Sequence, residues 1–174
     1  MWKTIGRTLI TKPLPIEAPA LDPAHVAELA QRVDASARRR LGRSLAIREV
    51  DAGSCNGREL EIHALNNPFH DLERFGIKFT ASPRHADVLI VTGPVTQNMR
   101  EALERTYAAT PDPKWVVAVG DCAFDGGLFK ESYAVAGGVA AVLPVDLVIP
   151  GCPPSPAALM KGLLALMTGG AAES

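Results

Sequence analysis

The chain has 174 residues, a formal net charge of −1 and 47% hydrophobic residues, which suits one packed domain with at most a small appendage. The sequence contains no long block of lysine and arginine, which argues against nucleic acid as the main partner. No apolar run reaches the ~18 residues that a membrane span needs. The N-terminus lacks a signal-peptide core, so we expect a protein of the cytosol with reduced thiols and no transmembrane segment.

Residues 1–43 are predicted to form an N-terminal arm and a helix. The arm, over 1–21, contains several prolines and no clear period, and it either docks on a partner or stays loose. The helix begins at Asp22 and Pro23, which suit an N-cap and a first helical position. Apolar residues then recur at three- and four-residue steps until Leu41, and Gly42 ends the helix.

Residues 44–168 are predicted to form the main domain. The predicted strands span 44–50, 77–80, 87–92, 114–120 and 146–150, and the predicted helices span about 60–66, 97–109 and 156–168, with a helical turn at 70–76. The strands are apolar throughout rather than alternating, which is typical of a parallel sheet buried on both faces. We therefore expect an α/β, flavodoxin-like domain whose mostly parallel sheet has a four-stranded core and helices on both faces.

Three further segments have weaker signals. Residues 121–145 are rich in glycine and are predicted to be a long loop without regular structure, of the kind that is usually functional or faces a partner. In the helix near residue 60, Leu60, Ile62, Ala64 and Leu65 are predicted to form the buried face. Residues 169–174 are predicted to be a frayed tail.

All three cysteines of the chain follow a predicted strand. Cys55 lies in a turn after the first strand, Cys122 follows Gly120-Asp121, and Cys152 lies between Gly151 and Pro153. Parallel strands end at one edge of their sheet, the edge where α/β proteins place ligands, so we expect the three thiols to emerge together. An odd number of cysteines in a reducing compartment argues for ligands rather than disulfides.

Thiolates select zinc, copper(I) or iron–sulfur clusters. The sequence has no Cys-x-x-Cys pair, which structural zinc sites usually use. A [4Fe-4S] cluster is large enough to be held from several loops. A free FMN-binding protein is an alternative, because Ser54, Gly57 and Arg58 at a helix N-terminus suit a phosphate. The scarcity of aromatic residues and the lack of a Thr/Ser-rich phosphate loop argue against it.

Several motifs together resemble one family. They are Ser54-Cys55-Asn56-Gly57 with Glu59-Leu60-Glu61-Ile62, Arg74-Phe75-Gly76-Ile77, the run from Ser82 to Thr96, Val119-Gly120-Asp121-Cys122-Ala123 and Pro150-Gly151-Cys152-Pro153-Pro154. Over about residues 45–167 the chain resembles the small iron–sulfur subunit shared by membrane-bound, energy-converting [NiFe] hydrogenases and respiratory complex I.

The resemblance implies an electron-transfer subunit of a membrane-associated oxidoreductase, in which Cys55, Cys122 and Cys152 are cluster ligands. It implies a peripheral position on the cytoplasmic side of the membrane. The implied partners are a large catalytic subunit, without which the chain would not be active, a ferredoxin-like subunit and membrane-arm subunits.

The chain departs from this family at the fourth ligand. Hydrogenase-type members have a second cysteine where this chain has Arg58, and complex I members have it where this chain has Asn56. Three explanations remain open: a [4Fe-4S] cluster with a non-cysteine fourth ligand, a [3Fe-4S] cluster, or loss of the cluster, which would leave a structural or coupling subunit. Arginine stays protonated and is a poor ligand. The conceivable substitutes are Glu59, Glu61, His63 and Asp121.

Overall fold

The computed structural model describes residues 23–168, so the predicted arm over 1–21 and the tail over 169–174 lie outside the described residues. Its main sheet has five strands, all parallel, in the order β2-β1-β3-β5-β7. The strands are β1 (Ala46–Asp51), β2 (Lys78–Phe79), β3 (Val88–Thr92), β5 (Trp115–Val119) and β7 (Leu147–Ile149). The α/β, flavodoxin-like prediction is confirmed: four strands form the core, and the two-residue β2 adds a fifth at one edge.

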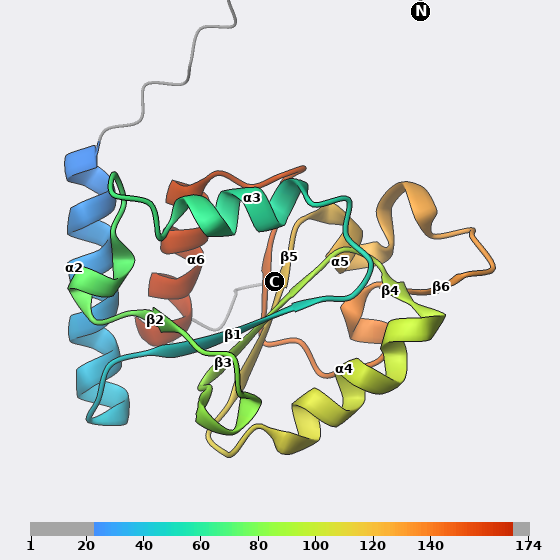
Figure 1. Ribbon diagram of the computed structural model, residues 1–174, viewed down its shortest axis with the longest axis horizontal. Helices are drawn as coiled ribbons and strands as arrows, with labels where there is room; N and C mark the ends of the chain where they lie inside the picture. Colours follow the sequence, from blue (N-terminus) through green and yellow to red (C-terminus); the bar gives the residue numbers. More distant parts are fainter. Residues whose placement is uncertain (1–22, 169–174) are drawn as a thin grey trace, which may run out of the picture.

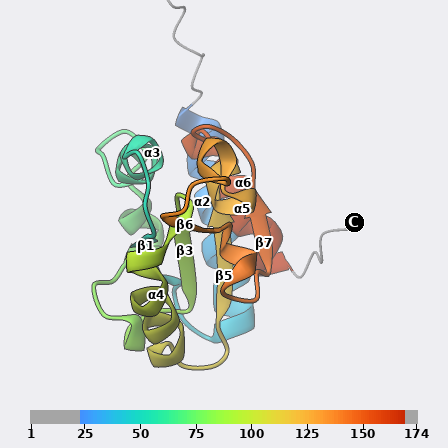
Figure 2. The same cartoon turned by 90° about the vertical axis from the view of Figure 1, so that its right-hand side faces the viewer.

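Helices cover both faces of the sheet, as predicted (Figure 1 and Figure 2). One face packs against α2 (Pro23–Leu41), α3 (Gly57–Ala64) and α6 (Pro156–Thr168). The other face packs against α4 (Gln97–Ala109) and α5 (Asp121–Asp125). Neighbouring residues of one strand serve different faces: Ile90 lies in the first core and Val91 in the second. This double burial explains why the strands are apolar throughout.

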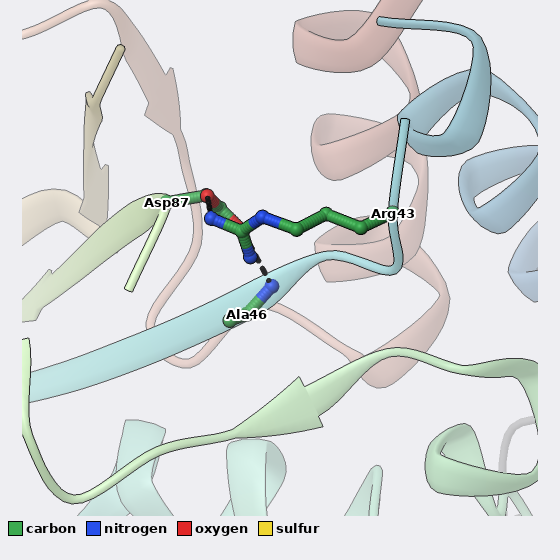
Figure 3. A network of polar contacts seen from close by, with 3 residues as sticks. All are labelled: Arg43, Ala46 and Asp87. Atoms are coloured by element: carbon green, nitrogen blue, oxygen red, sulfur yellow. Dashed lines mark hydrogen bonds and ion pairs between the residues drawn. The ribbon is translucent and has the colours of Figure 1, made fainter. Parts of the chain in front are cut away.

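A buried carboxylate ties the beginnings of β1 and β3 together. The Asp87 carboxylate, at the start of β3, accepts the backbone N–H of Ala46 at 2.9 Å and a guanidinium N–H of Arg43 at 3.0 Å (Figure 3). A second nitrogen of Arg43 donates to the other oxygen of the same carboxylate. The Asp87 side chain is only 3% exposed, so these bonds satisfy a charge that would otherwise be costly to bury.

The prediction that residues 121–145 lack regular structure is wrong. The segment contains α5 and, after it, η3 (Gly127–Phe129), β6 (Val135–Gly137) and η4 (Val139–Ala141). β6 pairs antiparallel with β4 (Val95–Thr96), which follows β3. Each of these elements has five residues or fewer, which is too short to show a hydrophobic period.

Two single-turn 3₁₀ helices complete the described part of the fold. They are η1 (Leu72–Phe75), within the predicted helical turn at 70–76, and η2 (Pro83–His85), before β3. Within residues 23–168, no helix is both long enough and apolar enough to cross a lipid bilayer.

Candidate functional site

The three cysteines lie in loops at the carboxyl edge of the parallel sheet, as expected. Cys55 lies between β1 and α3, Cys122 lies in the first turn of α5 directly after β5, and Cys152 follows β7. All three are free thiols; Cys122 is buried, and Cys55 and Cys152 are exposed. The fold therefore gathers at one edge residues that are far apart in the sequence.

A tight turn at the end of β1 positions the Cys55 loop. One carboxylate oxygen of Asp51 accepts the backbone N–H groups of Gly53 at 2.8 Å and Ser54 at 2.7 Å. The loop also packs closely on Gly93, where a Cβ atom would lie 2.4 Å from the Ser54 nitrogen. Only glycine allows this approach, so the backbone before Cys55 is fixed from two sides.

Asp121 joins the other two cysteine loops. Its carboxylate accepts the backbone N–H of Gly151 at 2.8 Å, and its own N–H donates to the Gly151 carbonyl at 3.1 Å. These two bonds connect the residue before Cys122 with the residue before Cys152. The structural roles of Asp51 and Asp121 were not predicted from the sequence. An Asp followed by Gly two residues later, at a strand end, is a turn signal that would have identified Asp51.

Arg58 lies among the cysteines as a buried residue, with 1% of its surface exposed. Its side chain crosses Gly120, where a Cβ atom would lie 1.9 Å from the Arg58 Nε atom. Its Nη2 atom donates to the Cys152 sulfur at 3.9 Å. The prediction that Leu60 lies on the buried face of this helix is wrong: Leu60 is 62% exposed. α3 instead buries Arg58 and Ile62, which are one helical turn apart.

The three cysteines affect the pKa of the Arg58 guanidinium. Burial by itself acts to lower the pKa of this guanidinium, and negative charge on Cys122, then on Cys152 and Cys55, raises it. The net result is a pKa above the ordinary arginine value, so the guanidinium is a permanent cation beside the cysteine loops.

The donor set fits an iron–sulfur cluster better than a single metal ion. Among residues 23–168, no group of three His, Cys, Asp or Glu side chains is arranged to hold one metal ion. Three soft sulfurs on separate loops suit the larger cluster, whose irons are bound one by one. The lack of a side chain at Gly127 leaves room beside Cys122, because a Cβ there would lie 2.7 Å from its sulfur. Beside these loops the chain has the Arg58 guanidinium, which donates hydrogen bonds and does not bind metal.

The conceivable substitute ligands have other contacts. Glu59 accepts the Ser54 hydroxyl at 2.7 Å and, like His63, lines a separate recess beneath α3. The Asp121 carboxylate is used by the Gly151 N–H. Glu61 lies farther along α3 and is half-buried. Arg58, rather than any of these four, donates a hydrogen bond to a cysteine sulfur, that of Cys152.

Comparison with known proteins gives several relatives. The chain is 46% identical over 140 residues to formate hydrogenlyase subunit 7 of Escherichia coli, a match that covers 80% of this chain and 55% of that protein. It is 47% identical over 124 residues to a probable membrane-bound hydrogenase subunit of Pyrococcus furiosus, covering 71% and 74% of the two chains. It is 51% identical over 107 residues to a subunit of the NADH-quinone oxidoreductase of Citrifermentans bemidjiense, covering 62% of each chain. The chain thus spans just over half the length of its Escherichia coli relative.

A solved structure shares the fold. It is a chain of the membrane-bound sulfane sulfur reductase, an archaeal respiratory membrane complex, with a TM-score of 0.65 and 34% identity over 85% of this chain and 75% of that one. The family model described as the NADH ubiquinone oxidoreductase 20 kDa subunit matches residues 55–166, a range that contains all three cysteines and Arg58. The resemblance expected from the sequence is confirmed: this chain is a member of that family.

Proposed function

We propose that the chain is the electron-transfer subunit of a hydrogenase-like or complex I-like membrane oxidoreductase, and that Cys55, Cys122 and Cys152 hold an iron–sulfur cluster. The observation that carries the proposal is the placement of the three cysteines in loops at one sheet edge, where the buried Arg58 donates to the Cys152 sulfur. When bound, such a cluster accepts and returns single electrons. The names of the relatives, which are subunits of hydrogenases and of a quinone oxidoreductase, support the same class of assembly.

In this proposal the chain's own residues hold and tune the site. Asp51 and Asp121 fix the three loops through their backbone hydrogen bonds. Arg58 places a positive charge and N–H donors where family members of the hydrogenase type would have a fourth thiolate. One thiolate fewer and one cation more both favour the electron-rich state, so the reduction potential is expected to be higher than with four cysteines.

We propose that the partners are those of the related complexes: a large catalytic subunit, a ferredoxin-like subunit and membrane-arm subunits, with this chain peripheral on the cytoplasmic side. Large apolar side chains support a docking surface beside Cys122. Phe124 is 58% exposed, Leu128 95% and Tyr133 96%, all within the segment that follows this cysteine. Exposed apolar side chains clustered in one segment mark interaction surfaces. Catalysis would require the large subunit, because the described residues offer no catalytic grouping.

A second candidate is a structural or coupling subunit that has lost the cluster. The observation that favours it is the enclosure of Arg58: the guanidinium is buried and contacts Cys152, so it fills space between the cysteine loops. A cation that is hydrogen-bonded to thiols can hold the three loops together in place of a cluster.

Anaerobic purification of the complex that contains the full chain distinguishes the electron-transfer subunit from the structural subunit. The electron-transfer proposal predicts a brown protein, with about four irons and four sulfides per chain for a [4Fe-4S] cluster or about three irons for a [3Fe-4S] cluster, and an EPR signal on reduction or oxidation. A colourless protein without iron after reconstitution contradicts it and supports the structural subunit. A yellow protein with a flavin spectrum contradicts both.

Substitution at position 58 tests the role of the arginine. Arg58→Cys is expected to lower the reduction potential or to increase the iron content, because it adds a fourth thiolate at the site. Arg105→Cys is the matched control, since it adds a thiol to an exposed position of α4. An EPR signal and potential unchanged by Arg58→Cys would show that position 58 does not face a cluster.

A further inference from the structure

A second polar site lies beneath α3, away from the cysteine sulfurs. It is a recess of about 500 Å³ between α3 and the strands β1 and β2, and Figure 1 shows α3 running above these two strands. β1 contributes Arg48, Glu49 and Asp51 to its lining, and α3 contributes Glu59 and His63. From the sequence, only Glu59 and His63 of this group were expected at a site, and only as metal ligands.

The recess contains an unusual concentration of buried polar atoms without partners. Among the described residues, seven buried side-chain nitrogen or oxygen atoms lack a hydrogen-bond partner. Three of them belong to the lining: Oε1 of Glu49, Oε1 of Glu59 and Nε of Arg48. Glu59 is 8% exposed, and only its other oxygen is satisfied, by the Ser54 hydroxyl. Buried polar groups in native proteins are almost always paired, so the two carboxylate oxygens, of Glu49 and Glu59, indicate a missing hydrogen-bond donor.

The charges of the recess call for a cation. The lining contains three carboxylates and one arginine, and His63 completes its charged or titratable part. The pKa of the Glu49 carboxyl is raised, first by burial and then by the negative charge of Glu59 and, more weakly, of Asp51; His63 and Arg48 act in the opposite direction. The carboxylates of the lining thus outnumber its guanidinium three to one.

The arrangement of the carboxylates favours an organic cation over a metal ion. A metal ion needs its oxygen ligands to converge on one point, and the described residues contain no such group of three. A guanidinium is a flat cation with several N–H donors spread over its edge, so it can bond separate carboxylates at once. We propose that the recess is a binding site for an alkylguanidinium group, held by Glu59 and Glu49.

The proposal does not depend on a cluster, because none of the three cysteines lines the recess. Its first test is titration of the iron-free, full-length chain with agmatine, a small alkylguanidinium, followed by NMR. We expect saturable shifts at Glu49, Glu59 and Thr80. Tetramethylammonium, which has charge but no N–H donors, is expected to cause no saturable shift at these residues.

Matched variants locate the binding. Glu59→Gln and Glu49→Gln remove one charge each with little change in shape, and each is expected to weaken agmatine binding at least tenfold. Glu61→Gln lies on the same helix outside the recess and is expected to leave binding unchanged. Equal weakening by all three variants, or by none, would overturn the assignment of the site.

A second experiment, which compares agmatine binding by the isolated chain and by the purified complex, identifies the source of the guanidinium. If it is a free small molecule, agmatine binds equally to the isolated chain and to the purified complex. If it is an arginine side chain of a neighbouring subunit, the complex excludes agmatine, and Glu59→Gln and Glu49→Gln weaken assembly while Glu61→Gln does not. The proposal is wrong if neither the isolated chain nor the complex binds agmatine and both variants assemble normally. Iron content plays no part in these outcomes, so they are independent of the electron-transfer proposal.

Discussion

The crossing of Arg58 over Gly120 can be tested by a double-mutant cycle. Gly120 has φ +87° and ψ 162°, a backbone region that is essentially restricted to glycine, so Gly120→Ala should cost about 1–3 kcal/mol for the backbone alone. The new Cβ would also lie 1.9 Å from Arg58 Nε, and relief of such overpacking costs roughly another 1–3 kcal/mol. The total loss in the free energy of unfolding is therefore about 2–6 kcal/mol.

Truncation of the arginine separates these two costs. In an Arg58→Ala background the overlap is gone, and Gly120→Ala should cost only its backbone share of about 1–3 kcal/mol. The coupling energy between the two positions is thus expected to be about 1–3 kcal/mol. Urea unfolding of the iron-free chain under reducing conditions, followed by circular dichroism, measures all four variants. A coupling energy below about 0.5 kcal/mol would refute the claim that the arginine lies across this glycine.

Three further predictions concern single substitutions. Burial raises the folded-state pKa of Glu49, so between the ordinary and the raised pKa the folded chain binds more protons than the unfolded chain, and the free energy of unfolding falls as pH rises through this window. Glu49→Gln should remove that fall and raise the free energy of unfolding at pH 7. A plot of unfolding free energy against pH whose slope is unchanged by the substitution would contradict this. Asp87→Ala should cost about 2–3 kcal/mol in urea unfolding, because it leaves the buried N–H of Ala46 without an acceptor and frees Arg43; a loss under about 0.5 kcal/mol would argue against this clamp. Asp121→Ala should cost about 1 kcal/mol and speed the amide hydrogen exchange of Gly151, whose N–H it leaves unpaired; unchanged exchange would show that the two loops are held by other contacts.

The parallel sheet was predictable because its signal is strong and local. Runs such as Val88–Thr92 are apolar at nearly every position, and three of the five predicted strands were followed by a predicted helix. The same logic correctly placed the three cysteines at one edge, since parallel strands end on the same side. The two-residue β2 was predicted as a strand, but its role as the fifth member of the sheet depends on pairing with β1, which is a tertiary contact.

The interior of the site was harder to predict, because it depends on helix rotation. The pattern around residue 60 suggested that leucine faces inward, and an arginine is seldom buried. α3 nevertheless buries Arg58 because three sulfurs and the open space above Gly120 can accommodate a long cationic side chain. The recess beneath α3 was missed for a related reason: β1 and α3 are separated by the cysteine loop, and nothing in the spacing of Glu49 and Glu59 indicates that they meet.

The positions of Arg58 and Glu59 have a mechanical consequence. They are consecutive residues of one rigid helix, yet one side chain reaches the sulfurs and the other reaches the acidic recess. A rotation or slide of α3 therefore cannot move one without the other. Since Coulomb energy varies inversely with separation, a small tilt of this helix changes the field at the thiols and at the carboxylates together. A displacement of α3 caused at the recess therefore also changes the electrostatic environment of the cysteines, and the reverse holds as well.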